Sequence, residues 1–151
     1  MKIHEKYMKM ALRQAKKAGE LGEVPIGAVI VKDGVVISRA YNKRNTSNQA
    51  THHAEILAIE KACKKLGDWR LDGAEMYVTL EPCPMCAGAI VNARIKTLYF
   101  GAFERKSGAV FSNFHVLYKG VLNHKTEALG GVLEEECSNI LKEFFKGKRK
   151  V

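Results

Sequence analysis

The sequence predicts a three-layer α/β domain in which helices cover both faces of a central mixed sheet of five strands. Strand-like apolar runs alternate along the chain with segments of helical periodicity, which is the pattern of a sheet covered by helices. An Asp33-Gly34 turn joins the first two runs into an antiparallel hairpin, so the sheet is mixed rather than purely parallel. The chain has 151 residues, 46% of them hydrophobic, which suits one domain over residues 1–151.

The first half of the chain is predicted to form a helix, the hairpin and a second helix. The helices are recognised by apolar residues at three- and four-residue spacing, and the second is ended by a glycine. The segment between hairpin and second helix is polar and has no periodicity, so we expect a loop. In order, the expected elements are a helix over 4–20, strands over 26–31 and 35–40, a loop over 42–49 and a helix from Thr51 or His52 to Gly67.

The second half is predicted to contain three strands and two helices. Pro84 suits the first turn of its helix, because backbone N–H groups there have no partner within the helix and the missing N–H of proline costs nothing. The last helix has acids at its start and Lys148-Arg-Lys150 after its end, which matches the helix dipole. Residues 101–123 have no clear pattern. In order, the expected elements are a strand over 76–80, a helix over 84–93, a strand over 97–100, a short strand near Ala128 and a helix over 134–146.

Charge and composition narrow the class of function. Formal net charge is +9, from 25 Lys and Arg against 16 Asp and Glu, and such a surplus favours anionic partners, nucleic acid first. No apolar run reaches the roughly 20 residues that a membrane span requires. The opening residues also lack the apolar core of a signal peptide. We therefore expect an intracellular protein without a membrane segment, whose four cysteines are thiols or metal ligands.

Two cysteines stand where a buried strand runs into a helix. Cys83 and Cys86 lie at i and i+3, so their side chains share one face and can bind one metal ion. The helix start lowers thiol pKa and favours the thiolates that zinc requires. His53 lies at another predicted helix start. If both helices aim their starts at one point, the result is a Cys₂His zinc site with a fourth position left for water, the pattern of catalytic sites.

Glu55 follows two residues after His53, and this spacing restricts how the two can act together. Positions i and i+2 lie about 200° apart on an ideal helix. Both can reach one metal-bound water only if they occupy the first turn and the metal lies beyond the helix end. In that position Glu55 would carry protons rather than bind the metal.

A redox pair is the alternative for a Cys-x-x-Cys in an intracellular chain, although Pro82 and Pro84 on either side of Cys83 differ from the usual redox context. The composite of His-x-Glu with Pro-Cys-x-x-Cys is instead the signature of zinc nucleobase deaminases. Cys63 and Cys137 fall on apolar helix faces and are expected to be buried thiols.

The chain resembles the bacterial tRNA-specific adenosine deaminases of the cytidine-deaminase-like superfamily over almost its whole length. The zinc motif is shared across the superfamily, whereas the long strand–helix match and the basic tail are more particular to the tRNA enzymes. The markers are Glu23-Val-Pro-Ile-Gly27, Asn42, His53-Ala-Glu55, Tyr77 to Gly88, Arg94-Ile95, Phe100-Gly-Ala102, Lys106-Ser-Gly-Ala109, Asn123-His124 and Phe144-Phe145.

The resemblance implies a cytoplasmic, homodimeric enzyme with the cytidine-deaminase-like fold and one Zn²⁺ per subunit. It would convert the wobble adenosine of a tRNA anticodon to inosine, chiefly in an arginine tRNA. Glu55 would be catalytic, and His53, Cys83 and Cys86 would bind the zinc. The residues expected at the target nucleoside are Val24, Asn42, Leu80 and Pro82.

Further residues are expected to contact the RNA outside the target base. The chain carries Glu104 where the family usually has aspartate, and residues 110–118 depart from the family's run of small residues, so the substrate contacts of this loop are in question. The expected RNA contacts are Arg44, Glu104, Arg105, Lys106, Phe145, Lys148 and Arg149.

Two other functions fit the same motif. The first is a zinc deaminase acting on free guanine, cytosine or a deoxycytidine nucleotide, which would have no use for a +9 charge and a basic tail. The second is a non-catalytic RNA-binding subunit of the same fold, which would have no use for Glu55.

Overall fold

The computed structural model describes residues 2–117 and 124–149, and the side chain of Arg149 lies outside this description. Five strands form one mixed sheet in the order β2-β1-β3-β4-β5. Strand β1 is antiparallel to β2 and β3, while β3, β4 and β5 are parallel. The predicted fold class is confirmed. The elements are α1 (Lys2–Glu20), β1 (Gly27–Lys32), β2 (Val35–Tyr41), α2 (Ala54–Leu66), β3 (Glu75–Leu80), α3 (Pro84–Asn92), β4 (Thr97–Ala102), β5 (Glu127–Leu129) and α4 (Glu134–Arg149).

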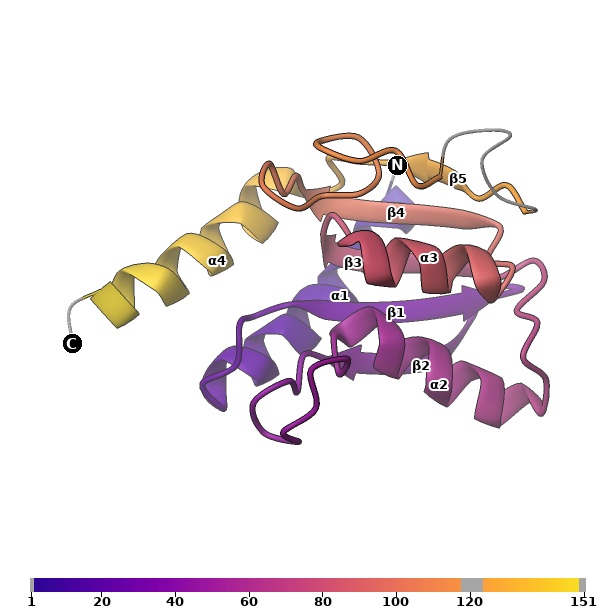
Figure 1. Cartoon of the computed structure of the whole chain (residues 1–151), viewed down its shortest axis with the longest axis horizontal. Coiled ribbons are helices and arrows are strands. Elements are labelled where there is room, and N and C mark those ends of the chain that lie inside the picture. The colour runs from indigo at the N-terminus through magenta and orange to yellow at the C-terminus, as the bar shows by residue number, and fades with distance from the viewer. Residues whose placement is uncertain (1, 118–123, 150–151) are drawn as a thin grey trace.

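The helices form the two outer layers. Helices α2 and α3 lie side by side on one face of the sheet, α1 covers the other, and α4 runs outward from one edge (Figure 1). A larger apolar cluster under α2 and α3 includes Ile30, Val78 and Ile90. A smaller cluster joins α1 to the start of α4 and includes Met8 and Cys137. Within the described residues, no helix has the length and apolarity to cross a membrane.

Element boundaries differ from the prediction where a turn replaces the expected helix. Helix α2 begins at Ala54 rather than near Thr51 or His52, because a turn closes from His52 N to Gln49 O at 3.1 Å before the helix starts. Helix α4 continues past residue 146 to Arg149. The hairpin turn is as predicted, with Asp33 and Gly34 at positive φ of 52° and 75°. Tyr118, Asn123 and Lys150 lie outside the described residues.

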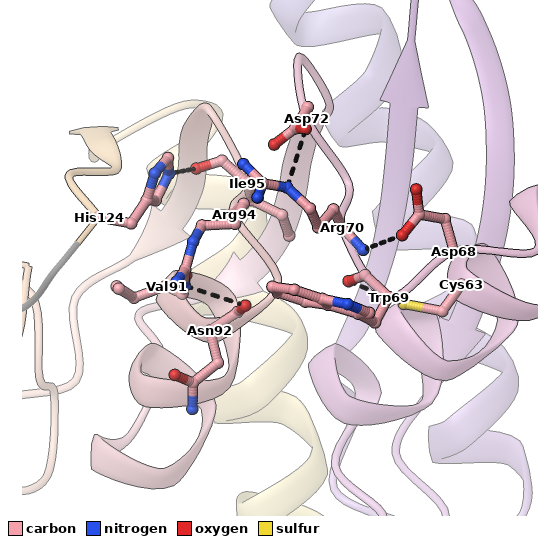
Figure 2. Close-up of polar contacts among 10 residues, drawn as sticks. All are labelled: Cys63, Asp68, Trp69, Arg70, Asp72, Val91, Asn92, Arg94, Ile95 and His124. Atoms are coloured by element: carbon pink, nitrogen blue, oxygen red, sulfur yellow. Dashed lines mark hydrogen bonds and ion pairs between the residues drawn. The ribbon is translucent and has the colours of Figure 1, made fainter.

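The carboxyl ends of α2 and α3 meet around an exposed tryptophan (Figure 2). Gly67 ends α2 in the left-handed conformation, with φ of 68°. The guanidinium carbons of Arg70 and Arg94 both lie 5.6 Å from the centroid of the Trp69 ring. Cys63, expected to be buried, is only half-buried, and its Sγ donates to the Trp69 carbonyl at 3.6 Å. The amino ends of α2 and α3 lie at the opposite ends of these helices, away from Trp69.

Gly27 sets how closely α1 approaches the sheet. A methyl group added at Gly27 would lie 2.5 Å from Ala15 N and would also collide with Ala11 O, both backbone atoms of α1. We expect Gly27→Ala to lower the free energy of unfolding by about 3 kcal/mol, because α1 must shift outward as a whole. Chemical denaturation would measure this. Gly147→Ala, where nothing lies within 4 Å, is the control and should change stability by less than about 1 kcal/mol. Equal stability of both variants would contradict the close packing.

Candidate active site

The residues at the starts of α2 and α3 supply the candidate metal ligands. His53 is the N-cap residue of α2 and Cys83 that of α3, and both have extended backbone, with φ of −74° in each case. Neither side chain caps its own helix. Both are therefore free to point beyond the helix end, where the positive ends of two helix dipoles favour anionic groups.

Three ligand atoms surround one point. His53 Nδ1 lies 3.7 Å from Cys83 Sγ and 3.5 Å from Cys86 Sγ, and all three atoms lie within 4.8 Å of one another. Zinc bonds of about 2.3 Å to sulfur and 2.0 Å to nitrogen in a tetrahedron would place nitrogen about 3.5 Å from each sulfur. The arrangement fits a tetrahedral ion without rebuilding, and these three protein ligands leave one position for a small molecule.

A hydrogen bond joins the two thiols and shifts their pKa values in opposite directions. A hydrogen bond from Cys86, with help from His53, lowers the pKa of the Cys83 thiol to about 4. The same hydrogen bond, together with burial, raises the pKa of Cys86. The lowered pKa favours the thiolate of Cys83, and a divalent cation bound by both sulfurs would displace the thiol proton of Cys86.

Glu55 occupies the second position of α2, in the first turn, and only 4% of its surface is exposed. Burial raises the pKa of its carboxyl to about 7, and a hydrogen bond from its own backbone N–H opposes the rise. A carboxyl with this pKa can both accept and release a proton near neutral pH, which general acid–base chemistry requires. The placement meets the condition set by the spacing of His53 and Glu55, because the metal position lies beyond the helix end.

A cavity of about 220 Å³ opens onto these side chains. Ligand sites for drug-sized molecules occupy roughly 300–1,000 Å³, so this cavity suits a smaller group such as one nucleobase. Its walls come from α2, the β3–α3 junction, the segment after β4 and the inner side of α4. The lining residues are Val24, Ile26, His53, Glu55, Leu80, Glu81, Cys83, Glu104, Ser107, Leu141 and Phe145.

Asn42 lies in an adjoining hollow of about 260 Å³, which it lines with Val24, Arg44 and His53. Its Nδ2 donates to the Val24 carbonyl at 3.3 Å, and its Oδ1 accepts from Arg44 N at 3.2 Å. Each group keeps capacity for one more bond, since a side-chain amide has two N–H donors and two acceptor lone pairs.

Other predicted residues lie outside the cavity wall. Pro82 is buried and does not line the cavity; its carbonyl accepts from Ala109 N at 2.8 Å. Arg105 and Lys106 are exposed on the loop after β4, which also supplies Glu104 to the cavity. Lys148 is exposed on α4, with its Nζ 5.1 Å from the Phe144 ring centroid.

Four residues of the cavity wall were not predicted from the sequence as site residues: Ile26, Glu81, Ser107 and Leu141. Glu81 is the most informative, because it is 2% exposed and its carboxylate accepts several backbone hydrogen bonds. These bonds outweigh the effect of burial and lower its pKa. The sequence did contain a signal for Glu81: it is an acidic residue in an otherwise buried run, directly before Pro82 and Cys83. A carboxylate buried there requires hydrogen-bond partners.

The chain matches known proteins over nearly its full length. The MafB19-like deaminase family matches residues 2–149. The tRNA-specific adenosine deaminase of Bacillus subtilis (strain 168) is 53% identical over 146 residues, covering 97% of this chain and 91% of that protein. The chain belongs to the tRNA-specific adenosine deaminase family. This membership makes it a deaminase, and it rests on 53% identity over 146 residues of the chain.

Solved structures agree with the family. A structure from work on A-to-I editing by tRNA:A34 deaminases at the wobble position of transfer RNA is 49% identical, with a TM-score of 0.87, and covers 89% of this deaminase and 98% of that chain. The guanine deaminase of Bacillus subtilis is 36% identical, with a TM-score of 0.66, and covers 98% of this chain and 94% of its own. The deaminase therefore follows the tRNA-editing structure more closely than this free-base enzyme.

Proposed function

We propose that this protein is a zinc-dependent deaminase that converts the wobble adenosine of a tRNA anticodon to inosine. The observation that carries the proposal is the group of His53, Cys83 and Cys86 around one point, with the buried carboxyl of Glu55 beside it in a cavity of nucleobase size. Family membership supports tRNA as the substrate. The net charge of +9 supports binding to an RNA backbone.

The reaction replaces the amino group on C6 of adenine with oxygen from water and releases ammonia. His53 Nδ1 and the Sγ atoms of Cys83 and Cys86 would hold the zinc, which supplies Lewis acidity that makes water a nucleophile at neutral pH. Glu55 accepts the proton of the attacking water and delivers it to N1 of the base. Glu55 then takes the proton of the new C6 hydroxyl and passes it to the amino nitrogen, so that the C6–N bond breaks and ammonia leaves. Burial of Glu55 keeps this proton transfer away from bulk water.

The target base must leave the anticodon stack to enter the cavity, so a loop is a better substrate than a duplex. Val24 and Leu80 would contact its faces, and Asn42 would hydrogen-bond the nucleoside with its remaining donor and acceptor. Phe145, 45% exposed at the cavity wall, offers a stacking surface for a neighbouring base. The proposed backbone contacts are Arg44, Arg105, Lys106, Lys148 and Arg149.

We further propose that the enzyme acts as a homodimer in the cytoplasm, where tRNA is processed, with an arginine tRNA as its main substrate. Gly88 lies on α3, and a methyl group added there would meet no atom within 4 Å among the described residues outside its own stretch of helix. A glycine in mid-helix is unfavourable by about 1 kcal/mol relative to alanine. Its presence is not explained by packing on the sheet, which supports close approach of a second subunit at α3.

The decisive experiment compares an arginine tRNA anticodon stem-loop with free bases. We expect conversion of the wobble adenosine, read by sequencing because inosine pairs as guanosine, and no ammonia release from guanine or cytosine. A stem-loop with the adenosine moved into the stem is the matched control. Ammonia release from guanine with an unchanged stem-loop would favour the free-base alternative, which the 36% identical guanine deaminase represents.

A further inference from the structure

The Glu81 carboxylate accepts hydrogen bonds from the backbone of the loop between β4 and β5. Its two carboxylate oxygens accept hydrogen bonds from the N–H groups of Glu104 at 3.1 Å, Val110 at 3.1 Å, Phe111 at 2.8 Å and Ser112 at 2.9 Å, and from the Ser112 hydroxyl. The donors come from both arms of one loop. A single buried carboxylate therefore fixes the conformation of a segment that has no regular secondary structure.

Gly108 makes this approach possible. A methyl group added at Gly108 would lie 2.5 Å from Glu81 Oε1 and would also collide with Glu81 Cδ and Glu104 O. The loop passes directly over the carboxylate only because this position has no side chain. The glycine of the Lys106-Ser-Gly108 turn is thus explained by Glu81, and not by the turn alone.

The loop held by Glu81 is joined to the metal-binding segment and to the cavity. Ala109 N donates to the carbonyl of Pro82, the residue before Cys83, at 2.8 Å. The same loop supplies Glu104 and Ser107 to the cavity wall. A change at Glu81 would therefore move one wall of the cavity, while the ligand atoms stay on the ends of α2 and α3.

Glu23 binds the loop between β2 and α2 in the same way, through hydrogen bonds from the loop to its buried carboxylate. It is 1% exposed, and its carboxylate accepts from Asn45 N at 3.1 Å and from the backbone N–H and hydroxyl of Thr46. The loop that it holds begins at Asn42 and ends at His53. Two buried glutamates thus hold the two loops that border the candidate site.

We infer that Glu81 and Glu23 are positioning residues that set the shape of the substrate cavity, Glu81 by holding its 103–117 wall and Glu23 by holding its 42–53 wall. Neither belongs to the group of ligand atoms, and the backbone N–H groups occupy the carboxylate oxygens. Their role is to fix the substrate-contacting loops before RNA arrives, so that binding does not have to order them. Only the kinetic consequence of this inference rests on the proposed function.

Glu81→Gln tests the inference with little change in side-chain size. The glutamine amide has only one acceptor oxygen. Its NH₂ group would face backbone N–H donors that are bonded to a carboxylate oxygen in the wild type, and these donors would lose their acceptor. We expect Glu81→Gln to raise KM for the stem-loop by about tenfold or more, with kcat within about threefold and zinc content unchanged. Gly108→Ala, which displaces the same carboxylate, should reproduce the KM shift. Glu60→Gln, an exposed change on α2, is the matched control and should leave both constants unchanged.

A merely structural role predicts a different result, because partial unfolding lowers the active fraction and thus apparent kcat while KM stays constant. That pattern, or an unchanged KM in Glu81→Gln, would overturn the inference. Amide hydrogen exchange gives a readout independent of activity. Exchange at Val110, Phe111 and Ser112 should accelerate at least about tenfold in Glu81→Gln, and at Asn45 and Thr46 in Glu23→Gln, while β3 stays protected. Unchanged exchange overturns the inference even if the enzyme is active, and a wild type inactive on RNA would count against the proposed function alone.

Discussion

Replacing Glu55 with glutamine is expected to lower kcat for deamination by about 10²–10⁴-fold while zinc remains bound, because general acid–base catalysis contributes this much. Among the described residues, three acids line the cavity: Glu55, Glu81 and Glu104. Both oxygens of Glu81 already accept backbone hydrogen bonds, and Glu104 Oε1 accepts from Lys106 N at 3.0 Å. Glu55 alone is positioned in the first turn beside the metal ligands, so no neighbour can replace it.

Single-turnover kinetics at saturating stem-loop would measure this change, because they separate the chemical step from binding and product release. Zinc per chain and the thermal midpoint should match the wild type. Glu60→Gln again serves as the matched control, since Glu60 is an exposed acid on the same helix. A loss smaller than about tenfold in Glu55→Gln would contradict the assignment of Glu55 as the proton carrier.

The grouping of His53, Cys83 and Cys86 could be predicted because the residues that specify each helix start are close together in the sequence. Cys83, Pro84 and Cys86 specify a strand that turns into a helix with two thiols on one face, and His53 with Glu55 specifies a second helix start. What the sequence could not place exactly was the start of α2. A turn at residues 49–52 uses backbone groups that the periodicity assigned to a helix.

Local sequence patterns could not place the cavity walls, because distant residues determine them; Val24, Leu80, Glu104 and Phe145 were expected only from the family resemblance. The 101–117 segment lacks periodicity, and its conformation depends on one carboxylate more than twenty positions earlier in the chain. Helix α4 shows clear amphipathicity, but its pattern does not indicate that Leu141 and Phe145 face the site. Long-range contacts of this kind leave only a weak local signal, such as the acidic Glu81 within a buried run.

Replacing Cys86 with alanine is expected to weaken zinc binding by more than about 100-fold, since changes outside the ligand set already weaken metal affinity 10- to 100-fold. Cys86 is fully buried, and its Sγ lies 3.5 Å from His53 Nδ1. The ligands come from the starts of two separate helices, so one ion would join α2 to α3, and its loss should also lower the thermal midpoint.

Zinc per chain after dialysis against a weak chelator is the measurement that decides the ligand assignment. Cys63→Ala is the matched control, because it removes the same atom from a half-buried thiol at the opposite end of α2, beside Trp69. It should retain one zinc per chain, whereas Cys86→Ala should retain less than about a tenth. Full zinc occupancy in Cys86→Ala would show that Cys83 and His53 hold the ion with some other ligand. The same loss in both variants would mean that instability, and not coordination, removes the metal.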